Sequence, residues 1–226
     1  MLLLKAVVVL ALASAPPTKP AASAGCATTH IETALQHLEA HLKTAVKSAS
    51  KDDSVDDSAM YFAEEAVGQT WTVRDVPNGY LSTGDGSDPT YEAALFKNPE
   101  GYHLVLVSFG TSAVNTAVYR CDKSGLTLEK DALEVPLDKA IQLYANAGLI
   151  ASKGKPGVTR QTLKDWAGSL VAYHLPRKGR VIRITSYVDE DGVYDKELGT
   201  LEYVQSKFQV VPLKKKAHAE APAKKP

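Results

Sequence analysis

The middle of the chain is a series of strand-like segments joined by short turns, and this pattern constrains the fold more than any other. One segment, residues 102–109, is apolar on both faces, with Leu104 and Leu106 on one side and Val105 and Val107 on the other. A strand of this kind lies inside a sheet whose two faces are both covered. Because strands joined by turns of a few residues pair antiparallel, we expect an antiparallel meander here.

Other segments repeat the strand signal. Residues 98–101, Asn-Pro-Glu-Gly, place proline and glycine where a tight turn needs them, directly before the central segment. Further strand patterns fall at residues 71–74, 91–97, 116–121 and 126–129, and again at 180–188, 198–204 and 207–213. Strand patterns therefore stop after residue 129 and resume at residue 180.

Four segments carry the apolar period of a helix instead. The first begins at a capping box, Thr29 to Glu32, and its apolar stripe comprises Ile31, Leu35, Leu38, Leu42 and Val46. The other three patterns lie at residues 60–67, 137–145 and 163–174. Together with the hairpins they predict an α+β fold, in which a mainly antiparallel sheet packs against a layer of about four helices.

Residues 1–24 have the form of an export signal. Lys5 precedes an unbroken apolar run from Ala6 to Ala13, which is too short to span a bilayer. We expect cleavage after Ala24 and a bacterial periplasmic or secreted protein that is not transmembrane. A lipid anchor on Cys26 is the alternative, although Ser23 stands where a leucine-like residue is usual.

The chain contains two cysteines, Cys26 and Cys121. In an oxidising compartment an even number of cysteines predicts a disulfide, here Cys26 to Cys121. A loop of this length, about 95 residues, removes conformational entropy from the unfolded chain worth roughly 4.7 kcal/mol. A lipid on Cys26 would exclude the disulfide, so the mass of the mature protein distinguishes the two.

The net charge of zero conceals an acidic body and a basic tail. Residues 1–24 hold two lysines, and residues 214–226 hold five lysines and one glutamate; the remaining 19 basic and 25 acidic residues give residues 25–213 a net charge of −6. We predict one globular domain at 25–213 that does not bind nucleic acid, and a disordered tail at 214–226. The tail lysines either contact anionic surfaces weakly or serve only as a solvated end.

The first helix carries the most specific polar pattern. His37 and His41 are four residues apart and project from the same side, so both can ligate one divalent metal ion, with His30 on the same stripe. The general base of a His-Glu-x-x-His helix is missing, because Leu38 stands in its place. The alternative is that these are half-buried histidines without a ligand.

No segment carries a specific catalytic or cofactor motif. The chain has no Gly-x-Ser-x-Gly elbow, its Ser-x-x-Lys matches at Ser48 and Ser152 lack their usual partner motifs, and its glycine pair at 84–86 does not precede a helix. We therefore predict no cofactor. Tyrosines at strand positions either form a ligand-binding face or act as good strand formers: Tyr91, Tyr102, Tyr119, Tyr187, Tyr194 and Tyr203.

Three functions remain open on these grounds, and the third is a metal-binding protein that uses His37 and His41. The first is an exported binding protein, without chemistry of its own, for a partner protein or an envelope polymer. The second is an exported hydrolase whose active site no motif marks. A cleft with mutually hydrogen-bonded titratable groups favours the hydrolase, whereas an aromatic groove without them favours binding.

Overall fold

The computed structural model describes residues 26, 30–48, 58–84, 87–110, 113–166, 168–188 and 193–213. The expected signal at 1–24, the tail at 214–226 and the Thr29 end of the capping box lie outside these residues. The described part contains the α-helices α1 (Ile31–Ser48), α2 (Ser58–Val67), α3 (Leu137–Asn146) and α4 (Arg160–Asp165), and a 3-10 turn, η2 (Val76–Asn78).

The expected antiparallel meander is confirmed as a six-stranded sheet. Its strands follow one another in chain order, and every neighbouring pair is antiparallel. They are β1 (Val73–Asp75), β2 (Tyr80–Ser82), β3 (Thr90–Asn98), β4 (Gly101–Phe109), β5 (Val114–Asp122) and β6 (Gly125–Leu128). The long strand β4 lies between β3 and β5, as its apolar sequence predicts.

The later hairpins form a second antiparallel sheet. It has four strands in the order β10-β9-β8-β7. They are β7 (Val171–His174), β8 (Val181–Ser186), β9 (Glu197–Val204) and β10 (Lys207–Pro212). The α+β class with mainly antiparallel strands is thus confirmed, but the strands divide between two sheets.

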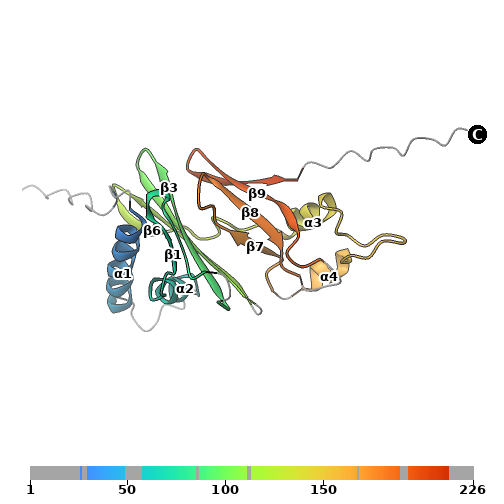
Figure 1. The fold of residues 1–226 in the computed structure, drawn as a ribbon, viewed down its shortest axis with the longest axis horizontal. Coiled ribbons are helices and arrows are strands. Elements are labelled where there is room, and N and C mark those ends of the chain that lie inside the picture. Colours follow the sequence, from blue (N-terminus) through green and yellow to red (C-terminus); the bar gives the residue numbers. More distant parts are fainter. Residues whose placement is uncertain are drawn as a thin grey trace, which may run out of the picture.

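The six-stranded sheet separates two hydrophobic cores, and β4 contributes to both. Leu104 and Leu106 pack with the apolar residues of α1 and α2, whereas Val105 and Val107 pack with the second sheet, α3 and α4. Figure 1 shows α1 and α2 on one side of the six-stranded sheet and the four-stranded sheet on the other, with α3 and α4 beyond it. The helices therefore form two pairs rather than one layer.

The prediction of a helix over residues 163–174 is wrong for most of its length. Helix α4 ends at Asp165, and residues 171–174 form β7, which pairs with β8. Tyr173 continues the helical spacing of Leu163, Trp166 and Leu170, but Val171 and Tyr173 are two residues apart, which is the spacing of one strand face. Both enter the core between the sheets. Pairing with β8 satisfies the backbone of this segment, so tertiary contacts override the local period.

The expected disulfide is present and ties the start of the described chain to the sheet. Cys26 and Cys121 are bonded, and their Cα atoms are 5.2 Å apart. Cys121 lies near the end of β5, on the face that α1 covers. Among the helices that the structure describes, none has the length and hydropathy needed to cross a membrane.

Candidate functional site

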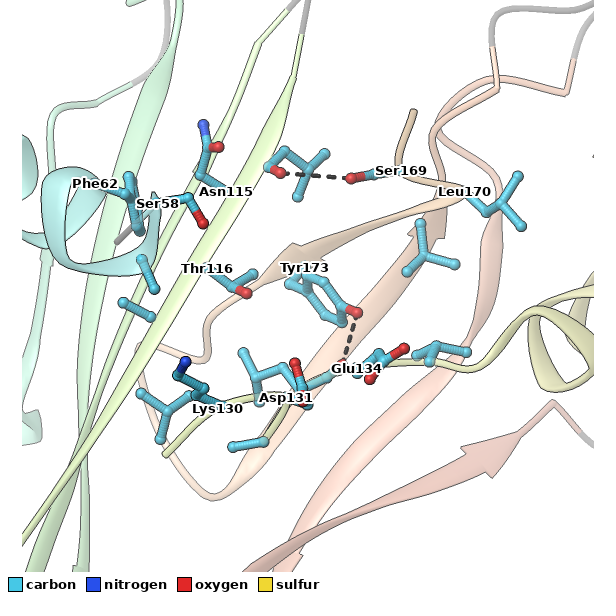
Figure 2. Close-up of a pocket in the computed structure, with 18 of the residues that line it drawn as sticks. Ser58, Phe62, Asn115, Thr116, Lys130, Asp131, Glu134, Ser169, Leu170 and Tyr173 are labelled. Carbon is cyan, nitrogen blue, oxygen red and sulfur yellow. Dashed lines mark hydrogen bonds between the residues drawn. The ribbon is translucent and has the colours of Figure 1, made fainter. Parts of the chain in front are cut away.

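A cavity of about 600 Å³ lies between the two sheets and extends past β5 to the first turn of α2, which covers the other face of the six-stranded sheet. Its walls come from the first turn of α2, from β5, from residues 128–135, from the end of α4 and from residues 168–173. Figure 2 shows Phe62 and Asn115 on one side of this space and Tyr173 and Ser169 on the other. Strands β6 and β7 are edge strands of their sheets, and neither pairs with a strand of the other sheet.

Two hydrogen bonds hold the walls of the cavity together. The Tyr173 hydroxyl donates to the backbone oxygen of Leu133 over 2.7 Å, and Ser169 Oγ donates to the backbone oxygen of Val114 over 3.4 Å. Burial, and then the charge of Glu134, raise the pKa of Tyr173. Tyr173 therefore stays protonated and acts as a fixed donor that joins β7 to the segment after β6.

Charged and amide groups line the mouth of the cavity. Asp131 and Glu134 are exposed, and within the described residues their carboxylates accept no hydrogen bond and join no ion pair. Asp131 has a φ of 59°, a left-handed conformation that aspartate tolerates better than most residues. Asn115 donates from Nδ2 to Ser108 Oγ over 3.2 Å, which leaves its amide oxygen available as an acceptor.

Aromatic rings complete the lining. Phe62 and Tyr173 are buried, whereas Trp166 is partly exposed. Gly168 leaves room for the indole, because a Cβ atom at this position would lie 3.1 Å from Trp166 Nε1. The cavity thus combines an accessible aromatic surface with hydrogen-bond acceptors, an arrangement found in sites for small polar ligands.

Comparisons with known proteins add no homologue. No protein-family model, no curated protein and no solved structure matches this chain. The geometry of the molecule is therefore the basis for its interpretation.

A second cavity, of about 630 Å³, contains a buried carboxylate. Glu92 accepts a hydrogen bond from the Tyr80 hydroxyl over 2.8 Å and another from the backbone nitrogen of Leu175 over 2.6 Å. Burial, and then Glu92, raise the pKa of Tyr80, which therefore remains a donor. Since both Glu92 oxygens are engaged, this group ties β2 and β3 to the end of β7, and it is a structural link between the sheets.

A network of titratable groups lies next to the first cavity. His103 Nδ1 is 2.6 Å from the Tyr203 hydroxyl, and His103 Nε2 is 3.2 Å from Glu129 Oε2. Arg120 Nε lies 2.9 Å from Glu129 Oε1. Glu129 also lines the cavity, but each of its oxygens already faces a partner inside the protein. No sequence pattern predicted this network, because its members come from β4, β5, β9 and the residue after β6.

The predicted metal ligands lie on or just before α1, on the face of the six-stranded sheet opposite Tyr173 and the second sheet. His37 Nδ1 is 3.5 Å from the Tyr102 hydroxyl, and the His41 and Tyr119 rings form a T-shaped pair with 6.3 Å between their centroids. Burial, and then the neighbouring His37, lower the pKa of His41. His30 is exposed. The three-histidine metal site remains a prediction.

The tyrosines do not form the ligand-binding face that was one interpretation of the sequence. Tyr194 is exposed, whereas the other five are buried: Tyr91, Tyr102, Tyr119, Tyr187 and Tyr203. Burial of these rings raises the pKa of Tyr102 and Tyr119 to about 12. The tyrosines therefore act mainly as core residues of the strands.

Sequence reasoning did not identify the residues around the first cavity. They come from segments between residues 58 and 173 and share no spacing. The one available signal was the charged stretch Glu129, Lys130, Asp131 and Glu134 between a strand and a helix, because connecting loops often carry binding residues.

Proposed function

We propose that the protein is an exported, non-catalytic binding protein that takes a short sugar segment of an envelope polymer into the cavity between its two sheets. The observation that carries this proposal is that one cavity is lined both by the partly exposed Trp166 and by the unengaged carboxylates of Asp131 and Glu134. A sugar ring offers an apolar C–H face that packs on an aromatic ring, and hydroxyl groups that donate to carboxylate and amide oxygens.

The size of the cavity supports a small ligand or a short piece of a larger one. Its volume of about 600 Å³ falls within the usual range for small-molecule sites. The open edge of the cavity lets a polymer enter by one segment without threading its end.

Export rests on the signal pattern of residues 1–24 and on the cysteine pair. A disulfide between Cys26 and Cys121 is compatible with an oxidising compartment. The envelope of a bacterium provides both that compartment and abundant glycan polymers.

We favour binding over catalysis because the titratable groups nearest the cavity already form hydrogen bonds or ion pairs within the protein. Tyr173 is committed to the Leu133 carbonyl oxygen, and the Glu129 oxygens face His103 and Arg120. A general acid or base must reach the bound substrate, and these groups are held by protein partners.

Tryptophan fluorescence tests the proposal directly, because the chain contains two tryptophans. Trp71 packs against the core under α1 and α2, so the Trp71→Phe variant leaves Trp166 as the reporter at the cavity. We expect a saturable change in its emission on titration with N-acetylglucosamine oligomers or with muropeptides released from peptidoglycan.

Charge variants provide the control. Asp131→Asn combined with Glu134→Gln should weaken this binding by at least tenfold, whereas Glu100→Gln, at the exposed β3 to β4 turn, should leave it unchanged. The proposal is wrong if neither probe alters Trp166 emission at millimolar concentration. It is also wrong if the double variant at Asp131 and Glu134 binds the probe as tightly as the Glu100→Gln control.

The exported hydrolase is the second candidate, and the His103, Glu129 and Tyr203 network favours it. A relay of this kind orients a base in many hydrolases. If it acts here, release of products from the same glycan probes should stop in Glu129→Gln, with binding retained. Intact probes after prolonged incubation with the unaltered protein would exclude hydrolysis of these substrates.

A further inference from the structure

We infer that reduction of the disulfide converts Cys26, Cys121 and His37 into a binding site for a zinc ion. The ligand atoms of these three residues all lie within 4.8 Å of one another. Sulfur and imidazole nitrogen are the ligands that Zn²⁺ prefers in proteins. This site differs from the three-histidine site expected from the sequence, with which it shares only His37.

The geometry of one pair already matches zinc coordination. Cys121 Sγ and His37 Nδ1 are 3.6 Å apart. With Zn–S bonds of about 2.3 Å and Zn–N bonds of about 2.0–2.1 Å, tetrahedral angles place a sulfur and a nitrogen ligand roughly 3.6 Å apart. His37 and Cys121 therefore lie where a shared metal ion would require them.

Secondary structure fixes both members of this pair. His37 projects from α1 beside Leu38, which is fully buried against the sheet, and Cys121 is fully buried on β5. The remaining movement is that of Cys26. Two thiolates on one tetrahedral zinc ion lie roughly 3.7 Å apart, so the Cys26 sulfur must withdraw from bonding distance once the disulfide is open.

The chemical steps balance with a dithiol as reductant. The dithiol becomes a disulfide, and two electrons and two protons pass to the sulfurs of Cys26 and Cys121. Zn²⁺ then displaces both thiol protons to the solvent and binds the two thiolates and His37 Nδ1, without a change in its own oxidation state. Water occupies the fourth position.

The zinc site and the disulfide are alternative states of the same link. Each joins the start of the chain to β5 and holds it beside α1. The metal thus preserves this link under reducing conditions, such as those before export. Oxidation of the two cysteines restores the disulfide and releases the zinc ion. The three-histidine site, in contrast, would bind metal in either redox state.

Cobalt titration distinguishes these possibilities. The full chain is reduced with a phosphine under anaerobic conditions, and Co²⁺ is added as a spectroscopic substitute for Zn²⁺. We expect a thiolate-to-cobalt charge-transfer band, visible bands of a tetrahedral ion, and loss of both on addition of one equivalent of Zn²⁺. The oxidised chain should give neither signal.

Two histidine variants form the matched pair. His37→Ala should weaken binding of Zn²⁺ to the reduced chain by at least tenfold, whereas His41→Ala, one turn further along α1, should not. Circular dichroism of each oxidised variant verifies that the fold is retained. Absence of a charge-transfer band in the folded reduced chain, equal binding by the oxidised chain, or a larger loss in His41→Ala would each overturn the inference.

Discussion

The side chain of Tyr173 contributes both to the hydrophobic core and to the wall of the candidate site. Its ring belongs to the core between the sheets, and its hydroxyl closes the cavity wall by donating to the Leu133 carbonyl oxygen. We predict that Tyr173→Phe lowers the free energy of unfolding by about 1–3 kcal/mol, since that carbonyl loses its donor in a buried place. Urea denaturation measures this change, with Tyr194→Phe on the exposed Tyr194 as the control. Equal stability of the two variants would show that the bond contributes little.

His103 predicts how stability depends on pH. Burial lowers its pKa, Glu129 partly offsets this effect, and Arg120 adds to the lowering. A histidine with a lower pKa in the folded state binds fewer protons when folded. Its stabilisation is present above the unfolded pKa of about 6.5 and is lost as the pH falls through the lower, folded value.

We therefore expect the free energy of unfolding to decrease between about pH 7 and about pH 5. His103→Gln should show a smaller decrease over this window. His41 and His174, whose pKa values burial also lowers, continue to contribute in that variant. Urea denaturation at a series of pH values provides the comparison, and parallel curves for the two proteins would contradict this role of His103.

At the scale of elements, the predictions were correct where the apolar pattern of a segment fits only one type of secondary structure. Residues 102–109 are apolar on both faces, and β4 indeed packs against helices on one face and against a sheet on the other. Residues 163–174 had two solutions, because their apolar spacing fits a helix and also allows a strand. Residues 171–174 form a strand because they pair with β8, which lies outside this segment of the sequence.

The turns between strands supply a prediction at this scale. Gly101 begins β4 at a φ of 156°, and a Cβ atom there would lie 2.0 Å from the backbone oxygen of Cys121. Gly125 begins β6 at a φ of 111° with nothing within 4 Å of such an atom. We expect Gly101→Ala to destabilise the protein more than Gly125→Ala, by upwards of about 1 kcal/mol, because only the first adds a backbone collision to the conformational cost. Thermal unfolding of both variants tests this, and the reverse order would place the constraint elsewhere.

At the scale of the whole molecule, the sequence predicts its components better than their arrangement. The strands and most helices follow from local periods, but the division into two sheets depends on which hairpins meet. The cavity is a consequence of that division, since Thr116, Asp131 and Tyr173 come together only after the sheets pack. For the same reason the candidate site could not be predicted, whereas the cysteine pair could, because two cysteines allow a single pairing.

The disulfide is the covalent link of largest span in the described structure, with a sequence separation of 95 residues. We predict that replacing both Cys26 and Cys121 with serine lowers the free energy of unfolding by about 2–5 kcal/mol, chiefly because the unfolded chain regains the freedom that the closed loop denies it. Urea denaturation of the oxidised protein and of the double variant measures the loss. The unaltered protein treated with a reductant and a chelator should match the variant, since the chelator prevents zinc from replacing the disulfide. If oxidised protein and variant unfold at the same urea concentration, the link does not stabilise the fold, and the argument for an oxidising compartment loses its structural support.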